Sequence, residues 1–402
     1  MKVEHLGIDC AMMGNKMKKS VVFLLMLLVV CLTTTAQKRE RYEFYKNFPV
    51  YADSLIAHSD YPLAWGTDKT RHFKKWKKKA LRQVFACMGP SLCYEKPRFD
   101  SIEFIRLDND SASYNTFRVL IPASPYYEIP ALLLIPKGQG PFPAVNVLHD
   151  HGAHLYIGKE KMVRPVGMDA AVLDDADQWV QQLYGGQYLG NYLAENGYVV
   201  LTADAPMWGE RGREEGADRS QYDIVAGNMM MYGYNLCAQM TYDDLTTTDF
   251  LCSLPQVDHE RVGCAGFSMG GYRAWMLSAL SSKIRAGAAI SWMVTTDVQM
   301  TWNYGRKENG GFANCIPGLR RYLDYPHIAS IACPKPMLFV NGRQDKLFPV
   351  IGVEKAFSIM HDVWKSQKAD HQLQTELWDI PHECNKEVQE RILHFLDEQF
   401  KK

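Results

Sequence analysis

The run from Gly263 to Gly271 constrains the fold more than any other part of this 402-residue chain. It reads G-C-A-G-F-S-M-G-G, a short apolar strand that ends in Gly-x-Ser-x-Gly, and a helix-forming sequence follows it. A serine at such a strand-to-helix turn has a strained backbone, and Gly266 and Gly270 let neighbouring backbone pass close because they lack a Cβ. The motif predicts that Ser268 is a nucleophile held out at the end of a strand.

Two polar residues follow later strands. Asp345 lies in the turn after one apolar strand, and His382 follows the next. Serine, acid and histidine in this chain order, each after its own strand, are typical of a catalytic triad on a parallel sheet. We predict that His382 accepts the proton of Ser268 and that Asp345 orients His382. Glu376 and Asp379 compete as the acid, but both lie within a strand.

The loop after the predicted strand 143–148 contains a His-Gly turn. An oxyanion hole needs one N–H from the residue after the nucleophile, here Met269, and another from a loop after an earlier strand. We assign the second donor to the backbone of His151, Gly152 and Ala153.

The same loop offers a metal site as an alternative. His149, His151 and His154 form H-x-H-x-x-H, and clustered neutral imidazoles are common zinc ligands. The pattern is similar to the metallo-β-lactamase signature, but that signature has an aspartate where this chain has Ala153. We predict no metal and no cofactor, with a metal at these histidines as the alternative.

Residues 1–36 have the pattern of a signal peptide. Lysines precede the apolar run 21–32, which is too short to span a bilayer, and the small residue Ala36 ends the segment. We expect cleavage near Ala36 and a periplasmic or extracellular protein without a membrane span, with a lipoprotein anchor at Cys31 as the alternative.

Charge and cysteine content exclude other classes of function. The formal net charge is zero, so no electrostatic argument favours nucleic acid as a partner. The ten cysteines have no spacing typical of a disulfide scaffold. Cys87 and Cys93 could form a local bridge, whereas Cys264 and Cys333 lie in apolar strands and are expected to be buried thiols. The sequence does not indicate an oligomeric state.

The order of predicted elements indicates an α/β fold. An N-terminal helical extension over 37–100 precedes a catalytic domain over 101–402. Strands are predicted over 102–107, 115–121, 129–135, 143–148, 198–203, 263–267, 286–291, 336–341 and 373–380, and helices over 178–196, 221–254, 272–281 and 385–400. After an antiparallel start, the alternation of strands and helices indicates a mostly parallel sheet with helices on both faces. Ligands of such sheets bind at the carboxyl ends of the strands.

Two long segments, 154–177 and 292–328, interrupt this alternation. Loops of this length are usually functional, so we expect them on the substrate side. Tryptophans there or on the loop after the strand 198–203 could stack on a sugar ring, although tryptophans more often pack in the core. The candidate substrate-binding residues are Trp208, Trp292, His149 and Arg211.

With these motifs the chain resembles the α/β-hydrolase superfamily from Ile102 onward, through the His-Gly loop, G-F-S-M-G-G, G-R-Q-D and P-H. The segments L-H-D-H-G-A-H and D-A-P-M-W-G-E-R-G, with the N-terminal extension, are similar to the dienelactone-hydrolase and acetyl-xylan-esterase branch. Secreted esterase-like proteins associated with SusD/RagB glycan uptake are also similar. The resemblance implies an α/β-hydrolase fold and an exported serine esterase acting on acetyl esters of plant-type polysaccharides.

Other functions stay open at this point. A methylesterase acting on uronic acids would use the same residues. A serine peptidase of this fold commonly carries an N-terminal propeller, for which the stretch from Gln37 to Ile102 is too short. A glycan-binding module without turnover is the alternative from another class, although a binding module has no need of a triad.

Overall fold

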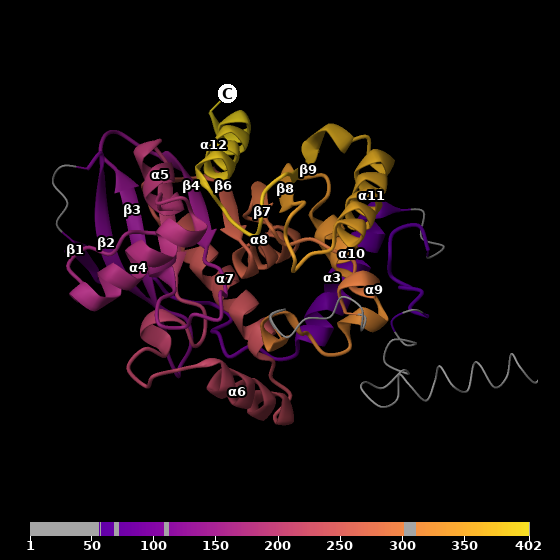
Figure 1. The fold of residues 1–402 in the computed structure, drawn as a ribbon, viewed down its shortest axis with the longest axis horizontal. Helices are drawn as coiled ribbons and strands as arrows, with labels where there is room; N and C mark the ends of the chain where they lie inside the picture. Colours follow the sequence, from indigo (N-terminus) through magenta and orange to yellow (C-terminus); the bar gives the residue numbers. More distant parts are fainter. Residues whose placement is uncertain (1–55, 57, 68–71, 108–111, 301–310, 402) are drawn as a thin grey trace, which may run out of the picture. The chain divides into compact units, whose positions relative to one another are not determined.

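A nine-stranded sheet crosses the part of the chain that the structure describes, a computed structural model covering residues 56, 58–67, 72–107, 112–300 and 311–401 (Figure 1). The strands are β1 (Phe104–Leu107), β2 (Tyr114–Pro122), β3 (Glu128–Pro136), β4 (Phe142–Leu148), β5 (Val199–Ala203), β6 (Val257–Phe267), β7 (Ala286–Ile290), β8 (Met337–Gly342) and β9 (Leu373–Trp378). Each corresponds to a predicted strand.

The strand order is β1-β2-β3-β5-β4-β6-β7-β8-β9. The pairs β1–β2, β2–β3 and β3–β5 are antiparallel, and every other neighbouring pair is parallel. The predicted antiparallel start and the mostly parallel sheet are therefore confirmed. Because β4, β6, β8 and β9 are parallel, the loops that follow them leave the sheet at the same edge.

Helices cover both faces of this sheet. The helices of the described residues are α3 (Phe73–Met88), α4 (Ala170–Leu183), α5 (Leu189–Glu195), α6 (Arg219–Met231), α7 (Leu236–Ser253), α8 (Met269–Leu280), α9 (Thr296–Gln299), α10 (Tyr325–Ala329), α11 (Val350–Ser366) and α12 (Lys386–Phe400), and α6 lies away from the sheet (Figure 1). Buried side chains of α4, α5 and α12 share one apolar cluster with the sheet, and those of α3, α8, α10 and α11 share another. The predicted α/β fold class is confirmed.

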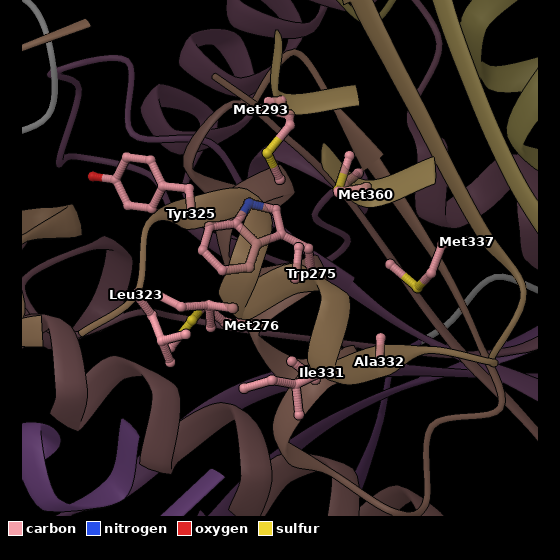
Figure 2. Close-up of a cluster of buried hydrophobic side chains, with 14 of the residues drawn as sticks. Trp275, Met276, Met293, Leu323, Tyr325, Ile331, Ala332, Met337 and Met360 are labelled. Carbon is pink, nitrogen blue, oxygen red and sulfur yellow. The ribbon is translucent and has the colours of Figure 1, made fainter. Parts of the chain in front are cut away.

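The second of these clusters packs around a tryptophan. The indole of Trp275, on α8, lies among Met276, Met293 and Tyr325 (Figure 2). Its ring centroid is 5.8 Å from that of Tyr325, with the planes at 63°. Flexible methionine side chains fill the irregular space that flat rings leave. This packing fixes α8 against the sheet, and α8 begins directly after Ser268.

Several helices differ from the predictions. The stretch 221–254 is two helices, because Gly233 adopts φ +79° after α6 and Asn235 caps α7 by accepting the Ala238 N–H at 2.7 Å. Helix α4 lies partly within the predicted insertion 154–177, and a break separates it from α5. Helix α11 is absent from the predicted elements, although its core-facing residues recur at helical spacing.

Other predictions concern the ends of the chain and the thiols. The predicted signal peptide and part of the predicted extension lie outside the described residues, whose helices include none long and apolar enough to cross a membrane. Cys264 and Cys333 are buried, as expected. Cys87 and Cys93 are free thiols, so the suggested local bridge is wrong; the Cys93 Sγ lies 3.3 Å from the Asp243 carboxylate instead.

The crossing of β4, β6 and α8 depends on two glycines. A Cβ on Gly270 would lie 1.8 Å from the Leu148 carbonyl oxygen, and one on Gly266 would lie 2.2 Å from the Gly270 carbonyl oxygen. Backbone atoms cannot move aside as a flexible side chain can. The chain therefore requires glycine here for close approach of strand and helix.

We expect Gly270→Ala to destabilise the protein by more than about 2 kcal/mol, because overpacking forces the backbone apart. The matched control is Gly227→Ala in α6, where no atom lies within 4 Å of the added Cβ. That change should stabilise by about 0.5–1 kcal/mol, the helix preference for alanine. Urea unfolding measures both; equal midpoints for the two variants would contradict the packing argument.

Candidate active site

Ser268 stands at the turn between β6 and α8. Its backbone has φ 55° and ψ −123°, a conformation that a residue with a Cβ rarely adopts. The Ser268 N–H donates to the Ile290 carbonyl of the neighbouring strand at 2.9 Å, which fixes the turn to the sheet. The strain is therefore held by surrounding structure, as expected where backbone geometry serves a function.

The structure brings Ser268, His382 and Asp345 together. The His382 Nε2 lies 2.9 Å from the Ser268 Oγ, and the His382 Nδ1 lies 2.6 Å from the Asp345 Oδ2. An ionised carboxylate only accepts hydrogen bonds, so Nδ1–H donates to Asp345 and Nε2 accepts the serine O–H. Three side chains from the ends of β6, β8 and β9 thus form one continuous chain of hydrogen bonds.

The surroundings hold this chain of hydrogen bonds in place. The Asp345 side chain is fully buried, and its Oδ1 accepts the Leu347 N–H at 2.8 Å. The His382 ring packs against Phe267 and Phe348, with centroids 4.8 and 5.9 Å away. These contacts leave the imidazole little freedom to rotate.

The two competing acids have other partners. Glu376 pairs with Arg391 at 2.7 Å, and the Asp379 carboxylate accepts a hydrogen bond from the Gln344 amide at 2.9 Å. Of the three carboxylates considered, Asp345 is the one in contact with His382.

The predicted oxyanion residues lie at the same end of the sheet. Met269 opens α8, so its N–H is one of the first helical N–H groups, which have no acceptor within the helix. Gly152 and Ala153 have φ values of 57° and 53°, a tight left-handed turn. The Ala153 N–H donates to the Nδ1 of His151 at 2.8 Å. That N–H is therefore already bonded, which corrects its assignment as an oxyanion donor.

A buried ion pair between Lys161 and Asp150 stabilises the turn at Gly152 and Ala153. Lys161 is fully buried, and its Nζ lies 3.3 Å from the Asp150 carboxylate and 3.2 Å from the carbonyl oxygens of Asp150 and His151. The other carboxylate oxygen of Asp150 accepts the Tyr184 O–H at 2.6 Å. A Cβ on Gly152 would lie 2.2 Å from the Trp179 ring. The turn is thus fixed by buried polar contacts and by an aromatic ring.

The three histidines of the suggested metal site do not share a ligand position. His149 is fully buried, its Nδ1 lies 2.9 Å from the Asp150 carbonyl, and its Nε2 accepts the Ala205 N–H at 3.0 Å. Burial and nearby positive charges lower the pKa of His149 well below its usual value. His154 stacks on Trp179 and pairs with Asp175 at 2.6 Å. Each imidazole is thus engaged separately.

Among the described residues, one group of acidic side chains has the spacing of a metal site: Glu160, Asp204 and Glu210. The ammonium of Lys159 lies 2.9, 2.8 and 2.7 Å from these three carboxylates, so a cation of the protein itself fills the position. Burial alone would lower the pKa of Lys159, but the carboxylates raise it above its ordinary value. The group is a buried ion-pair network.

A pocket of about 220 Å³ opens beside Ser268 and His382. Its wall is mostly apolar and includes Met269, Tyr272, Trp292, Leu347 and Phe348. His151, Arg219 and Asn314 are polar groups in the same wall. Of the four predicted substrate-binding residues, Trp292 therefore lies at the pocket.

The other three lie elsewhere, which corrects their assignment. Trp208 is fully buried, with its Nε1 donating to the His151 carbonyl, so neither ring face can stack on a sugar. His149 is in the core. Arg211 pairs with Asp243 at 2.7 Å and covers the Tyr127 ring in a separate groove.

Sequence patterns did not reveal Arg219, Asn314 or Phe348 as pocket residues. Arg219 is the first residue of α6, directly after the Asp218 cap, and Asp218 with Gln221 forms a capping box. The capping box was the signal available in the sequence, since it places Arg219 at a helix start.

We expect Lys159→Met to destabilise the protein by about 3–5 kcal/mol, because it leaves three buried carboxylates without their cation. The control is Lys283→Met, which breaks the exposed Lys283–Asp249 pair (2.7 Å) and should cost less than about 1 kcal/mol. Chemical unfolding of both variants measures the difference, and equal losses would refute the network's role.

The chain is similar to known hydrolases in sequence. The sequence profile of the Abhydrolase family matches residues 70–381. The protein named "Putative hydrolase YtaP" from Bacillus subtilis is 28% identical over 290 residues, which span 72% of this chain and 88% of that protein.

Solved structures share the fold. One named a "putative acetyl xylan esterase", from Bacteroides fragilis, has a TM-score of 0.64 at 17% identity, covering 82% of this chain and 81% of that one. A glucuronoyl esterase from Solibacter usitatus has a TM-score of 0.57 at 12% identity, covering 84% and 96%. The match over 70–381 and the observed sheet order together show that this chain is a member of the Abhydrolase family, with the α/β-hydrolase fold.

Proposed function

We propose that this protein is a serine esterase that removes small acyl groups, preferably acetyl, from carbohydrates. The observation that carries the proposal is the hydrogen-bonded series Ser268–His382–Asp345, which opens into an apolar pocket. A serine, a base in contact with it and a group that orients the base form the arrangement required for nucleophilic acyl transfer.

The chemistry follows from the positions of the protons. The Ser268 Oγ attacks the ester carbonyl carbon while the His382 Nε2 takes the serine proton, and Asp345 stabilises the imidazolium that forms. The tetrahedral intermediate collapses when His382 returns that proton to the departing alcohol. Water, deprotonated by His382, then hydrolyses the acyl-serine and restores the free enzyme.

Pocket size and polarity support a small acyl group. The pocket of about 220 Å³, bounded by side chains such as Trp292 and Phe348, has room for an acetyl group and part of a sugar. The solved structures that share this fold include a putative acetyl xylan esterase and a glucuronoyl esterase by name, which supports a carbohydrate ester as substrate. Export after cleavage near Ala36 remains part of this proposal.

Arg219 favours a second candidate, an esterase acting on uronic-acid esters. Arg219 lines the pocket together with Ser268. A positive group there would attract a glycan that carries neighbouring carboxylates. Rates with a methyl uronate and with an acetylated neutral xylan would separate the two candidates; a preference for the methyl uronate would favour the second.

A serine peptidase and a glycan-binding module are the remaining alternatives. A peptidase would cleave a chromogenic peptide amide faster than the matched ester. A binding module would retain glycan without releasing acyl groups, and its binding would be insensitive to loss of the Ser268 hydroxyl.

We expect the wild-type protein to hydrolyse a chromogenic acetyl ester and Ser268→Ala to lower kcat by at least about 10³-fold, because the nucleophile is lost. Steady-state release of the chromophore measures this. The control is Ser253→Ala, whose hydroxyl donates to the Phe250 carbonyl at the end of α7; it should retain wild-type activity. Equal activity of wild type and Ser268→Ala would refute the serine mechanism.

A further inference from the structure

The side chain of His151 has a defined proton position. Its Nδ1 accepts the Ala153 N–H at 2.8 Å, and a backbone N–H can only donate. A neutral imidazole carries one proton, so with Nδ1 as acceptor the proton is on Nε2. The turn at Gly152 and Ala153 therefore selects one tautomer, in which Nε2–H is a hydrogen-bond donor.

The surroundings keep this ring neutral. Burial, helped by the positive charges of Lys161 and Arg219, lowers the pKa of His151 to about 3. The imidazolium is therefore absent at neutral pH, and His151 cannot act as a competing acid or base. Some enzyme active sites use a neutral histidine in the same way, as a hydrogen-bond donor whose proton stays on one ring nitrogen.

Packing fixes where the donor lies. The ring meets Trp208 and Tyr222 edge to face, with centroids 4.9 and 5.9 Å away. His151 lines the pocket together with Ser268, Met269 and His382. Within the described part of the chain, no acceptor of the protein is in hydrogen-bond contact with its Nε2. His149 differs, because both of its ring nitrogens are engaged inside the core.

We infer that the Nε2–H of His151 donates a hydrogen bond to the oxyanion of the tetrahedral intermediate, together with the Met269 N–H. The inference rests on the proposed esterase function. The loop after β4 supplies this donor through an imidazole, and the Ala153 N–H, one of the backbone donors predicted for this role, is bonded to the same ring. No proton leaves His151 during the reaction: it stabilises charge that develops on the carbonyl oxygen.

The hydrogen bond from Ala153 strengthens this donor. A ring nitrogen that accepts a hydrogen bond polarises the imidazole, so the opposite N–H becomes a better donor. The carbonyls of Asp150 and His151 are in turn held by Lys161. Lys161 therefore holds the turn at Gly152 and Ala153, and this turn orients the His151 ring whose Nε2–H is the proposed donor.

Two substitutions at His151 test the roles of its two ring nitrogens separately. In His151→Asn the side-chain carbonyl can accept the Ala153 N–H as Nδ1 does, but the Nε2–H donor is lost. In His151→Gln an amide nitrogen can occupy the position of Nε2, but the acceptor for Ala153 is lost. If the donor stabilises the oxyanion, the Asn variant should lose about 10²–10³-fold in kcat with KM nearly unchanged. The Gln variant should retain at least about ten times the kcat of the Asn variant.

The opposite order would overturn the inference. If His151 only holds the loop, the Asn variant keeps wild-type kcat and the Gln variant is impaired. Nitrogen NMR of the folded wild-type protein gives an independent readout: we expect Nε2 to be protonated and Nδ1 unprotonated, and a proton on Nδ1 would refute the inference whatever the kinetics. Thermal unfolding of both variants identifies any loss that comes from misfolding.

The same experiment distinguishes failure of the inference from failure of the proposed function. Ser268→Ala is measured beside the two His151 variants with the same acetyl ester. An active wild type, an inactive Ser268→Ala and a fully active His151→Asn would refute the role of His151 alone. A wild type no faster than Ser268→Ala would refute the esterase function and the inference with it.

Discussion

The close contact between Gly270 and the Leu148 carbonyl is the constraint on which the rest of the site depends. It joins the first turn of α8 to the end of β4, so the nucleophile turn and the loop at His151 meet at one edge of the sheet. Only glycine permits this approach, since a Cβ would overlap the carbonyl oxygen. The strained backbone of Ser268 follows from the same crossing, because strand and helix leave no room for a wider turn.

Buried charge then positions the loops around this crossing. Lys161 binds the backbone of the His151 turn, and Lys159 joins Asp204, at the end of β5, to Glu160 and Glu210. Taking such ions out of water is costly, and a buried pair rarely adds net stability over apolar packing. These pairs instead fix the orientation of nearby backbone groups, such as the His151 carbonyl, because hydrogen bonds are directional and apolar contacts are not.

Much of the fold could be predicted from the sequence. Apolar runs separated by helical patterns predicted all nine strands. Because Ser268, Asp345 and His382 each come after a strand, their grouping at one edge of the sheet could also be predicted. These signals are local, so they survive without knowledge of tertiary contacts. The catalytic role of the three residues remains a proposal, supported by their mutual hydrogen bonds.

The remaining features could not be predicted because they depend on contacts between distant residues. Trp208 and Arg211 follow a strand at the correct edge, but Trp208 is buried against the His151 carbonyl, and Arg211 pairs with Asp243 in a separate groove. A polar loop sequence does not reveal which side chains turn inward. The proton position on His151 likewise depends on the φ value of Ala153 and on the burial of the ring, neither of which appears in a linear pattern.

The most direct test of the central claim is to locate the nucleophile by covalent labelling. The folded protein is treated with a fluorophosphonate, which reacts with activated serines, and its peptides are mapped by mass spectrometry. We expect one adduct per chain, on Ser268, and none after denaturation before labelling. An unlabelled protein, or an adduct on any other residue, would contradict it.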